Sequence, residues 1–193
     1  MNVQTPAETD FTHRLATEYD LPALRQVMDL AIAQLQRGFL DETQIAASRL
    51  VMGLDTQLVA DRTYFLLEAN GRIAGCGGWS RRATLYGGDH STALRNAALL
   101  DPARDAARVR AMYTHPDFTR RGVGRRILDL CESAAAAAGF SRVELMATLA
   151  GLPLYRACGY VEIEPVVSET DLGPVPLVRM GKVLTPITDT SVD

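Results

Sequence analysis

Apolar positions recur with two different periods along the chain, and each period predicts one kind of element. Within 17–36 they recur at every third or fourth position, which places them on one face of a helix. A second helix is expected over 41–52, where an aspartate can cap the first turn. Two β-rich runs within 63–80 flank Asn70-Gly71, and this dipeptide is the strongest short signal for a hairpin. The first half of the chain therefore combines helices with a hairpin.

The second half alternates strands with helices. The segment from Trp79 to about Asp105 has no clear pattern, and we expect Gly87 to about Asp105 to form a mobile loop that flanks a pocket. The order of elements predicts one mixed α/β domain over 1–193, with loose tails at 1–10 and 185–193. The remaining strands are expected at 11–16, 107–114, 142–148, 160–163 and 175–184, and the remaining helices at 127–138 and 152–159.

Composition and charge narrow the class of protein. The chain has 193 residues, 47% of them hydrophobic, which is enough for one domain with a buried core. Its net charge of −3 argues against a nucleic-acid partner and against binding to anionic lipid. No apolar run has membrane length and no signal peptide is recognisable, so we expect a cytoplasmic protein without a membrane partner. The sequence leaves homodimer formation open.

One short segment concentrates arginine and glycine. TRRGVGRR, at 119–126, follows a predicted strand and leads into a predicted helix. Glycines let the backbone approach an anion closely, and the first N–H groups of a helix lack intrahelical partners. The arginines can neutralise a dianion such as a pyrophosphate, although a solvated helix start of the same composition is an equal alternative. A P-loop is excluded because GxxxxGK[ST] is absent, and GCGGWS at 75–80 lacks the third glycine and the following helix of a dinucleotide site.

Two separated segments resemble the signatures of a known family. VRAMYTHPDFTRRGVGRRIL, at 109–128, resembles the acetyl-CoA signature of the GNAT superfamily of N-acetyltransferases, with Gly122 and Gly124 as its glycine pair. The leading Gln/Arg position of that signature is Thr119 here, a departure that the neighbouring arginines can compensate electrostatically. In element order, the resemblance covers about 11–184.

The second segment is MATLAGLPLYRACGY, at 146–160, which resembles the second signature of the same superfamily. Tyr155 and Gly159 match that pattern. The departures are Thr148 at an Asn position, Gly151 at an Ala position and Tyr160 at a Phe position. Two signatures at a plausible separation identify the family much more specifically than either does alone.

The resemblance implies the GNAT fold and a place for acetyl-CoA. This fold has a central mixed, mostly antiparallel sheet of about seven strands, flanked by four helices and splayed between the fourth and fifth strands. Acetyl-CoA lies in that opening. By position, main-chain groups of Met112, Tyr113 and Thr114 would bind the pantetheine arm and thioester. The pyrophosphate would be wrapped by the segment that comprises Arg120, Arg121, Gly122, Val123, Gly124 and Arg125.

The same resemblance implies direct attack of an amine on the bound thioester. Tyr155 matches the general acid that protonates the departing thiolate, and its alternative is a tyrosine that merely lines the groove. No general base is assigned, because each candidate is more often an ordinary surface or strand residue. Direct attack makes the three cysteines poor acyl carriers, and the scattered Cys and His residues show no metal-binding spacing, so no metal is expected. The base candidates are Glu68, Asp89, His90 and Glu144.

The acceptor would enter opposite acetyl-CoA. We expect it to be a primary amine of a small molecule, or of a peptide or protein. Arg81 and Arg82 could select an acidic group on it, although a solvated strand end is the commoner role. A non-catalytic acyl-CoA-binding sensor or interaction module on the same fold is the alternative function. The candidate acceptor residues are Phe39, Trp79, Tyr86 and Thr148, of which Trp79 is equally well explained as a hydrophobic plug.

Overall fold

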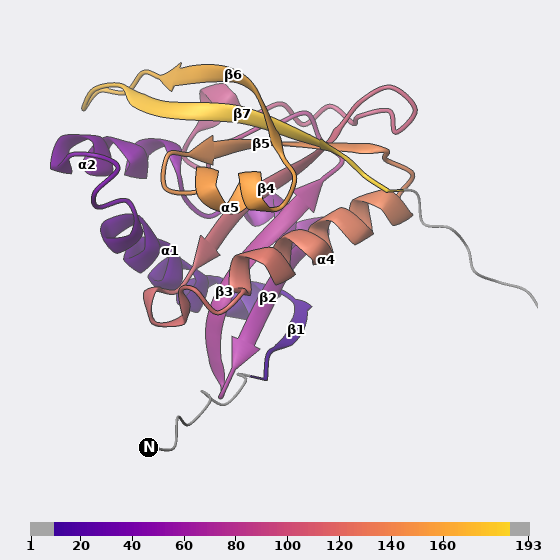
Figure 1. Cartoon of the computed structure of the whole chain (residues 1–193), viewed down its shortest axis with the longest axis horizontal. Coiled ribbons are helices and arrows are strands. Elements are labelled where there is room, and N and C mark those ends of the chain that lie inside the picture. Colours follow the sequence, from indigo (N-terminus) through magenta and orange to yellow (C-terminus); the bar gives the residue numbers. More distant parts are fainter. Residues whose placement is uncertain (1–9, 186–193) are drawn as a thin grey trace, which may run out of the picture.

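The computed structural model of the protein describes residues 10–185, and within them seven strands form one sheet. The strand order is β1-β2-β3-β4-β5-β7-β6 (Figure 1). The predicted loose tails fall almost wholly outside the described residues, and the extent of the domain, 1–193, stays a prediction. The strands are β1 (Thr12–Leu15), β2 (Tyr64–Ala69), β3 (Arg72–Ser80), β4 (Ala107–Thr114), β5 (Arg142–Thr148), β6 (Val161–Ser168) and β7 (Val175–Val183).

Five α-helices accompany the sheet in the described residues, one more than predicted. The additional helix, α3, has only five residues, so it is too short to show a helical period in the sequence. The side chain of Asp55 caps it by accepting a hydrogen bond from the backbone N–H of Gln57 at 3.1 Å. The helices are α1 (Leu21–Leu35), α2 (Glu42–Val51), α3 (Thr56–Ala60), α4 (Val123–Ala137) and α5 (Leu152–Ala157).

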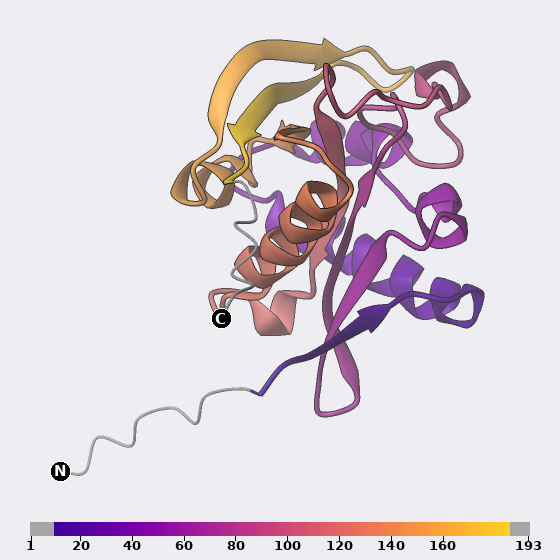
Figure 2. The ribbon, with the colours of Figure 1, turned by 90° about the vertical axis from the view of Figure 1, so that its right-hand side faces the viewer.

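The helices cover both faces of the sheet. Helix α4 packs on one face, whereas α1, α2 and α3 lie on the other (Figure 2). The apolar face of α4, with Ile127 and Leu128 fully buried, contacts β2, β3 and β4. On the opposite side, Leu24 and Met28 of α1 pack in a second core cluster. The sheet is therefore buried on both faces around its centre, as a mixed α/β architecture requires.

Two elements differ in length from the prediction, for local reasons. Helix α4 begins four residues earlier than expected, because Gly122 takes a left-handed conformation (φ +79°) and serves as its N-cap. Strand β6 runs to Ser168 rather than ending at 163, and it pairs with β7 along its length. Its sequence alternates only over 161–164, and Pro165 with the two valines that follow breaks the pattern in the exposed second half.

Strands β4 and β5 are parallel neighbours that separate soon after they meet. Their paired residues are Ala107 with Val143 and Arg108 with Glu144, and all other neighbouring strands are antiparallel. Beyond those pairs the two strands diverge (Figure 1). This splay, predicted from the sequence, leaves main-chain N–H and C=O groups on both sides of a gap. Such groups need partners when they are removed from water, so the gap is suited to a ligand with hydrogen-bonding groups.

A bulge in β4 shapes the edge of this gap. Gly78 of β3 pairs with Arg110, and Cys76 pairs with Tyr113, so one residue of β3 lies opposite two residues of β4. Within the bulge, Ala111 has a φ of +50°, a left-handed conformation that is unusual for a residue with a side chain. The buried hydroxyl of Tyr64 donates a hydrogen bond to the carbonyl of Ala111 at 2.7 Å and holds the bulge in place.

Candidate active site

Two cavities lie in the gap between β4 and β5. The first, which we call the helix-side cavity, has a volume of about 170 Å³ and extends between Ile32 of α1 and Gly124 of α4. The second, the loop-side cavity, has a volume of about 90 Å³ and extends toward Tyr86 and Leu177. The two cavities therefore adjoin and can be filled by two ligands side by side. The residues that line both are Met52, Met112, Tyr113, Thr148 and Tyr155.

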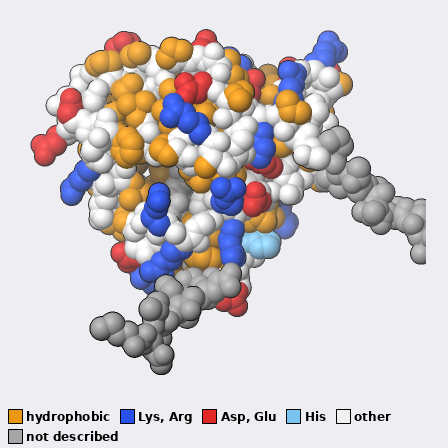
Figure 3. All heavy atoms as spheres, viewed as in Figure 1, with side chains coloured by type: hydrophobic (Ala, Val, Ile, Leu, Met, Phe, Trp, Pro, Cys, Tyr) orange, Lys and Arg blue, Asp and Glu red, His pale blue; other side chains and the backbone are white. Residues whose placement is uncertain are grey.

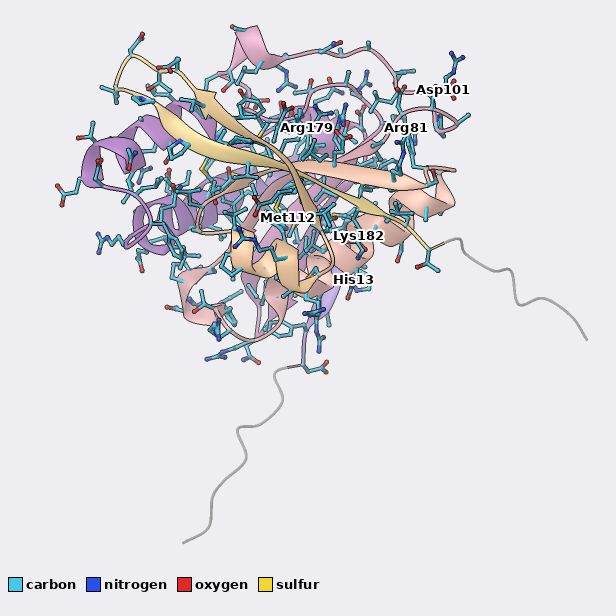
Figure 4. The ribbon with its side chains drawn as sticks, turned by 45° about the horizontal axis from the view of Figure 1, so that its top comes forward. His13, Arg81, Asp101, Met112, Arg179 and Lys182 are labelled. Atoms are coloured by element: carbon cyan, nitrogen blue, oxygen red, sulfur yellow. The ribbon has the colours of Figure 1, made fainter. Side chains whose placement is uncertain are left out.

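The structure brings together candidate residues that are far apart in the sequence. Met112 and Tyr113 of β4 meet Thr148 and Tyr155 where the two cavities join. Figure 4 shows Met112 next to α5, the helix that carries Tyr155. Thr114 lines only the helix-side cavity. The end of β4, which belongs to the acetyl-CoA signature, and helix α5, which belongs to the second signature, therefore line the same space.

The first turn of α4 presents free backbone N–H groups. The first backbone bond of this helix is donated by the N–H of Arg126 to the carbonyl of Gly122 at 3.0 Å, so the N–H groups of the preceding residues have no helical partner. Gly124 lines the helix-side cavity, and a Cβ atom there would lie 2.6 Å from the side chain of Leu154. Glycine thus lets the start of α4 approach α5 closely. Free amides together with the helix dipole form an anion site at this point.

Four arginines surround that turn, and all are exposed. None of them forms an ion pair with a carboxylate of the described residues. Arg121 lies over the ring of Phe118 and Arg126 over the ring of Phe11, at 5.6 and 5.2 Å from the ring centroids. Figure 3 shows basic side chains gathered on the lower half of the viewed face, where the N-terminal end of α4 lies. The positive charge at this end is therefore available to an anionic ligand.

Tyr155 is buried in the wall that both cavities share. Its hydroxyl makes no hydrogen bond to another described residue, and burial raises the pKa of the phenol well above its usual value. A raised pKa keeps the phenol protonated at neutral pH, so it can donate a proton. A Cβ atom at Gly151 would lie 2.8 Å from the ring of Tyr155, which explains why glycine replaces the expected alanine of the motif.

Two of the four candidate acceptor residues line neither cavity. Trp79 is 5% exposed and packs edge-to-face against Phe140, with ring centroids 6.2 Å apart. Its position on β3 directs it into the core under α4, which favours the interpretation as a hydrophobic plug. Phe39 is 49% exposed, on the link between α1 and α2. The residues that do line the cavities are Tyr86 and Thr148.

The arginines that follow β3 have structural partners instead of an acceptor. Arg82 makes a two-pronged contact with Asp61, at 2.7 and 2.9 Å. Arg81 lies over the ring of Trp79, 5.6 Å from its centroid, and is well separated from Met112 in Figure 4. Neither arginine lines the two cavities, so the structure gives no support to the suggestion that they select an acidic acceptor.

The long link between β3 and β4 flanks the loop-side cavity as predicted. Leu85, Tyr86 and Gly87 line the cavity. The backbone N–H of Asp89 donates to the carbonyl of Leu54 at 2.9 Å, and Ser91 donates to the carbonyl of Leu50, near the end of α2, at 3.2 Å. These bonds attach the link to α2 and to the segment that follows it, and the mobility of the link stays a prediction.

None of the candidate bases lines either cavity. Glu144 accepts hydrogen bonds from Arg108 and Arg179, and Glu68 is paired with Arg14. Asp89 accepts from the N–H of Thr56 at 3.0 Å, and His90 contacts the carbonyl of Leu50. These side chains are committed to structural contacts, which gives no support for any of them as a base.

The cysteines are equally unsuited to act as nucleophiles. Cys76 and Cys131 are fully buried, and burial raises the pKa of the Cys76 thiol to about 12. Cys158 is half-buried and lines neither cavity. A thiol with a raised pKa is uncharged at neutral pH and therefore a weak nucleophile.

One residue of the site was missed by sequence reasoning. Arg110 lines the loop-side cavity, although the sequence shows it only as a polar position of an alternating strand. It is 5% exposed and forms an ion pair with Asp55, whose side chain is fully buried. No local signal marks this burial, because the partner comes from a distant part of the chain.

The splayed sheet and the glycine turn that opens α4 are the two features that the GNAT resemblance implied. The sequence profile of the acetyltransferase (GNAT) family matches residues 24–160, and the chain belongs to this family. Membership supports acetyl transfer from acetyl-CoA in general terms.

No helix of residues 10–185 is long and apolar enough to span a membrane. The same residues contain no cluster of His, Cys, Asp or Glu suited to a metal ion.

Solved structures with the same fold are distant in sequence. A GCN5-related N-acetyltransferase from Rhodopseudomonas palustris is 18% identical, with a TM-score of 0.65, and the match covers 94% of this chain and 100% of that one. A ribosomal-protein-alanine N-acetyltransferase from Brucella melitensis is 17% identical, with a TM-score of 0.60 and coverage of 90% and 99%. The structure of yncA from Salmonella typhimurium with acetyl-CoA is 16% identical, with a TM-score of 0.58 and coverage of 95% and 99%. No curated protein matches the sequence.

Proposed function

We propose that this protein transfers the acetyl group of acetyl-CoA to a primary amine by direct attack within a ternary complex. The observation that carries the proposal is the pair of adjoining cavities in the gap between β4 and β5, with Tyr155 in their shared wall. One cavity leads to the free amides of α4 and suits the cosubstrate, and the other is left for the acceptor. Family membership and the neighbour that holds acetyl-CoA support this choice of cosubstrate.

In this proposal, the chain binds acetyl-CoA mainly with its backbone. Main-chain groups of Met112, Tyr113 and Thr114, on the unpaired side of β4, bind the pantetheine arm and orient the thioester. The free N–H groups at the start of α4 bind the pyrophosphate. The exposed arginines add long-range attraction for the negative charge. The segment that we propose to wrap the pyrophosphate comprises Arg120, Arg121, Gly122, Val123, Gly124 and Arg125.

The reaction requires the amine to lose protons and the departing sulfur to gain one. The amine must lose a proton before it attacks, because an alkylammonium ion, with a pKa of about 10, has no free electron pair. Solvent accepts this proton, since no carboxylate or imidazole of the described residues lines either cavity. The amine nitrogen then forms a bond to the thioester carbonyl carbon, the carbon–sulfur bond breaks, and Tyr155 donates its phenolic proton to the departing sulfur. As the amide forms, the nitrogen loses a second proton, which restores the phenol through solvent, whereas the first proton stays in solvent.

Acetyl-CoA binding can be tested with a glycine substitution in the turn before α4. Gly122→Ala forces an L-residue into a left-handed conformation, and a Cβ atom there would contact no other part of the protein. We expect binding of acetyl-CoA to weaken roughly tenfold, equivalent to about 1.4 kcal/mol. The measurement is isothermal titration calorimetry with acetyl-CoA.

Gly71→Ala is the matched control for this experiment. Gly71, in the β2–β3 hairpin, has a φ of +73° and equally open surroundings, but it lies outside both cavities. It should cost similar stability and leave the affinity for acetyl-CoA unchanged. Equal affinities of wild type and Gly122→Ala would refute the role of the glycine turn.

The reaction itself is tested by thiol release. Purified protein is incubated with acetyl-CoA and a panel of amines that includes polyamines, amino acids and peptide N-termini, and free CoA is measured with a thiol reagent. Amine-dependent release together with an acetylated product identified by mass spectrometry supports the proposal. Saturable acetyl-CoA binding without turnover on any amine would instead favour the acyl-CoA sensor.

A further inference from the structure

The loop-side cavity contains one charged side chain in an otherwise apolar or uncharged wall. Arg110 projects from β4 into this wall and is almost completely buried. Much of the remaining lining is aliphatic or sulfur-containing. The apolar members of the wall include Val51, Met52, Leu85, Val109, Met146 and Leu177.

The guanidinium of Arg110 is only partly satisfied by the protein. Its Nη1 contacts the carboxylate of Asp55, and its Nη2 donates to the carbonyl of Gly87. Its Nε is buried and has no hydrogen-bond partner among the described residues. An arginine carries five N–H donors, and unpaired donors removed from water cost free energy. Nη1 and Nη2 each carry a second N–H group beyond these contacts, whereas Nε has almost no exposed surface, so the capacity for a further acceptor atom lies on the two Nη atoms.

The carboxylate of Asp55 does not belong to Arg110 alone. It also accepts a hydrogen bond from Arg95 at 2.9 Å, so one fully buried carboxylate lies between two guanidinium groups. The next carboxylate, of Asp89, is 3.8 Å from Arg95 and is 41% exposed, where water screens its charge. The hydroxyls of Tyr86, Tyr113 and Tyr155 are the other titratable groups that line the cavity. The buried charge at this wall thus remains positive.

We propose that Arg110 binds a carboxylate of the acceptor, so that the substrate is a small amine that also carries an acid group and an apolar remainder. The inference rests on the proposed acetyl transfer. In this arrangement the amine lies at the junction of the two cavities, near Met112 and Tyr155. The carboxylate accepts hydrogen bonds from Arg110, and the apolar remainder contacts the aliphatic wall. An amino acid with an apolar side chain has this combination of groups.

The test uses matched acceptors that differ only in the acid group. Leucine and leucinamide share the amine and side chain, and the amide is the less basic amine, so a preference for leucine cannot arise from a larger unprotonated fraction. We expect wild type to favour leucine in kcat/KM by about 10- to 100-fold, the effect of a charge-assisted hydrogen bond. Equal rates for leucine and leucinamide, or faster turnover of leucinamide, would overturn the inference.

A charge-balanced double variant attributes the preference to Arg110. Asp55→Asn with Arg110→Met removes both members of the buried pair, and asparagine can still cap α3. We expect the preference for leucine to fall below about threefold. The control is Asp61→Asn with Arg82→Met, which removes a partly exposed pair at the other end of α3 and lies outside both cavities. It should retain the preference, and acetyl-CoA affinity measured by calorimetry should be unchanged in both.

Binding measurements separate failure of this inference from failure of the proposed function. Leucine and leucinamide are titrated into the CoA-bound protein and followed by calorimetry. Selective binding of leucine without turnover of any amine would sink acetyl transfer and support the carboxylate site. Acetylation of both amines with equal kcat/KM would support acetyl transfer and refute the carboxylate site. A preference that persists in the Arg110 double variant would assign it to another group and refute the role of Arg110.

Discussion

Tyr155→Phe is expected to lower kcat by about 10²- to 10⁴-fold, the usual contribution of a positioned general acid. Phenylalanine keeps the ring that packs beside Gly151 and loses only the hydroxyl, so the dissociation constant for acetyl-CoA should not change. Steady-state thiol release gives kcat, and calorimetry gives the dissociation constant. An unchanged kcat would reduce Tyr155 to a residue that lines the groove.

Tyr160→Phe is the matched control. The ring of Tyr160 packs against Tyr155 at a centroid distance of 5.8 Å, but Tyr160 lines neither cavity. Its phenylalanine variant also restores the residue that the family pattern has at this position. We expect its kcat to remain within about twofold of wild type, because no reacting group is removed. A large loss in this control would attribute the effect of Tyr155→Phe to packing.

The pH dependence gives a second check on the same assignment. Burial raises the pKa of Tyr155, so the phenol keeps its proton throughout the range in which the protein is assayed. The rate of wild type should therefore rise with pH as the amine loses its proton, and it should not fall again below about pH 10, the ordinary pKa of tyrosine. A descending limb near pH 8 would point to a different acid.

Asp55→Ala is expected to lower the free energy of unfolding by about 3–5 kcal/mol. The substitution leaves the buried guanidinium of Arg110 without its carboxylate, and breaking a buried pair from one side is much more costly than removing both members. It also removes the cap of α3, which adds to the loss. Urea denaturation followed by circular dichroism measures the change.

Asp61→Ala serves as the comparison for this loss. Asp61 pairs with Arg82, but both side chains are partly exposed, at 19% and 27%, so their interaction is screened by water. We expect it to cost about 1 kcal/mol or less. The double variant Asp55→Asn with Arg110→Met should also be more stable than Asp55→Ala. If Asp55→Ala lost no more stability than Asp61→Ala, the buried pair would contribute little to folding.

The parts of the fold that could be predicted are those whose cause lies in neighbouring residues. The helical period of α1, the Asn70-Gly71 hairpin and the glycine turn before α4 are all local, and each is found where it was expected. Helix α3 escaped prediction because one turn has no period. The far end of β6 escaped because Pro165 and the two valines that follow break the alternation.

The residues of the candidate site also differ in whether neighbouring sequence could place them. Tyr155 and Thr148 could be placed together because they belong to a motif in which sequence spacing fixes geometry. The direction of Trp79 depends on the register of β3 and on how far β3 extends over α4, which no short segment specifies. The burial of Arg110 depends on Asp55, which comes from another part of the chain. Residues whose orientation depends on contacts between distant parts of the chain are therefore the ones that the sequence did not place.

The bulge in β4 imposes a constraint on the length of this strand. Arg110 and Tyr113 are three positions apart, an odd number, yet they pair with Gly78 and Cys76, which are two positions apart on one side of β3. In a regular strand, residues separated by an odd number of positions point to opposite faces. Deleting a single residue between them would therefore restore a regular strand with both side chains still on one face, and it would remove the bulge at the edge of the gap. The extra residue thus shapes the edge of the gap, whereas the layer that contains the phenol of Tyr113 would survive its loss.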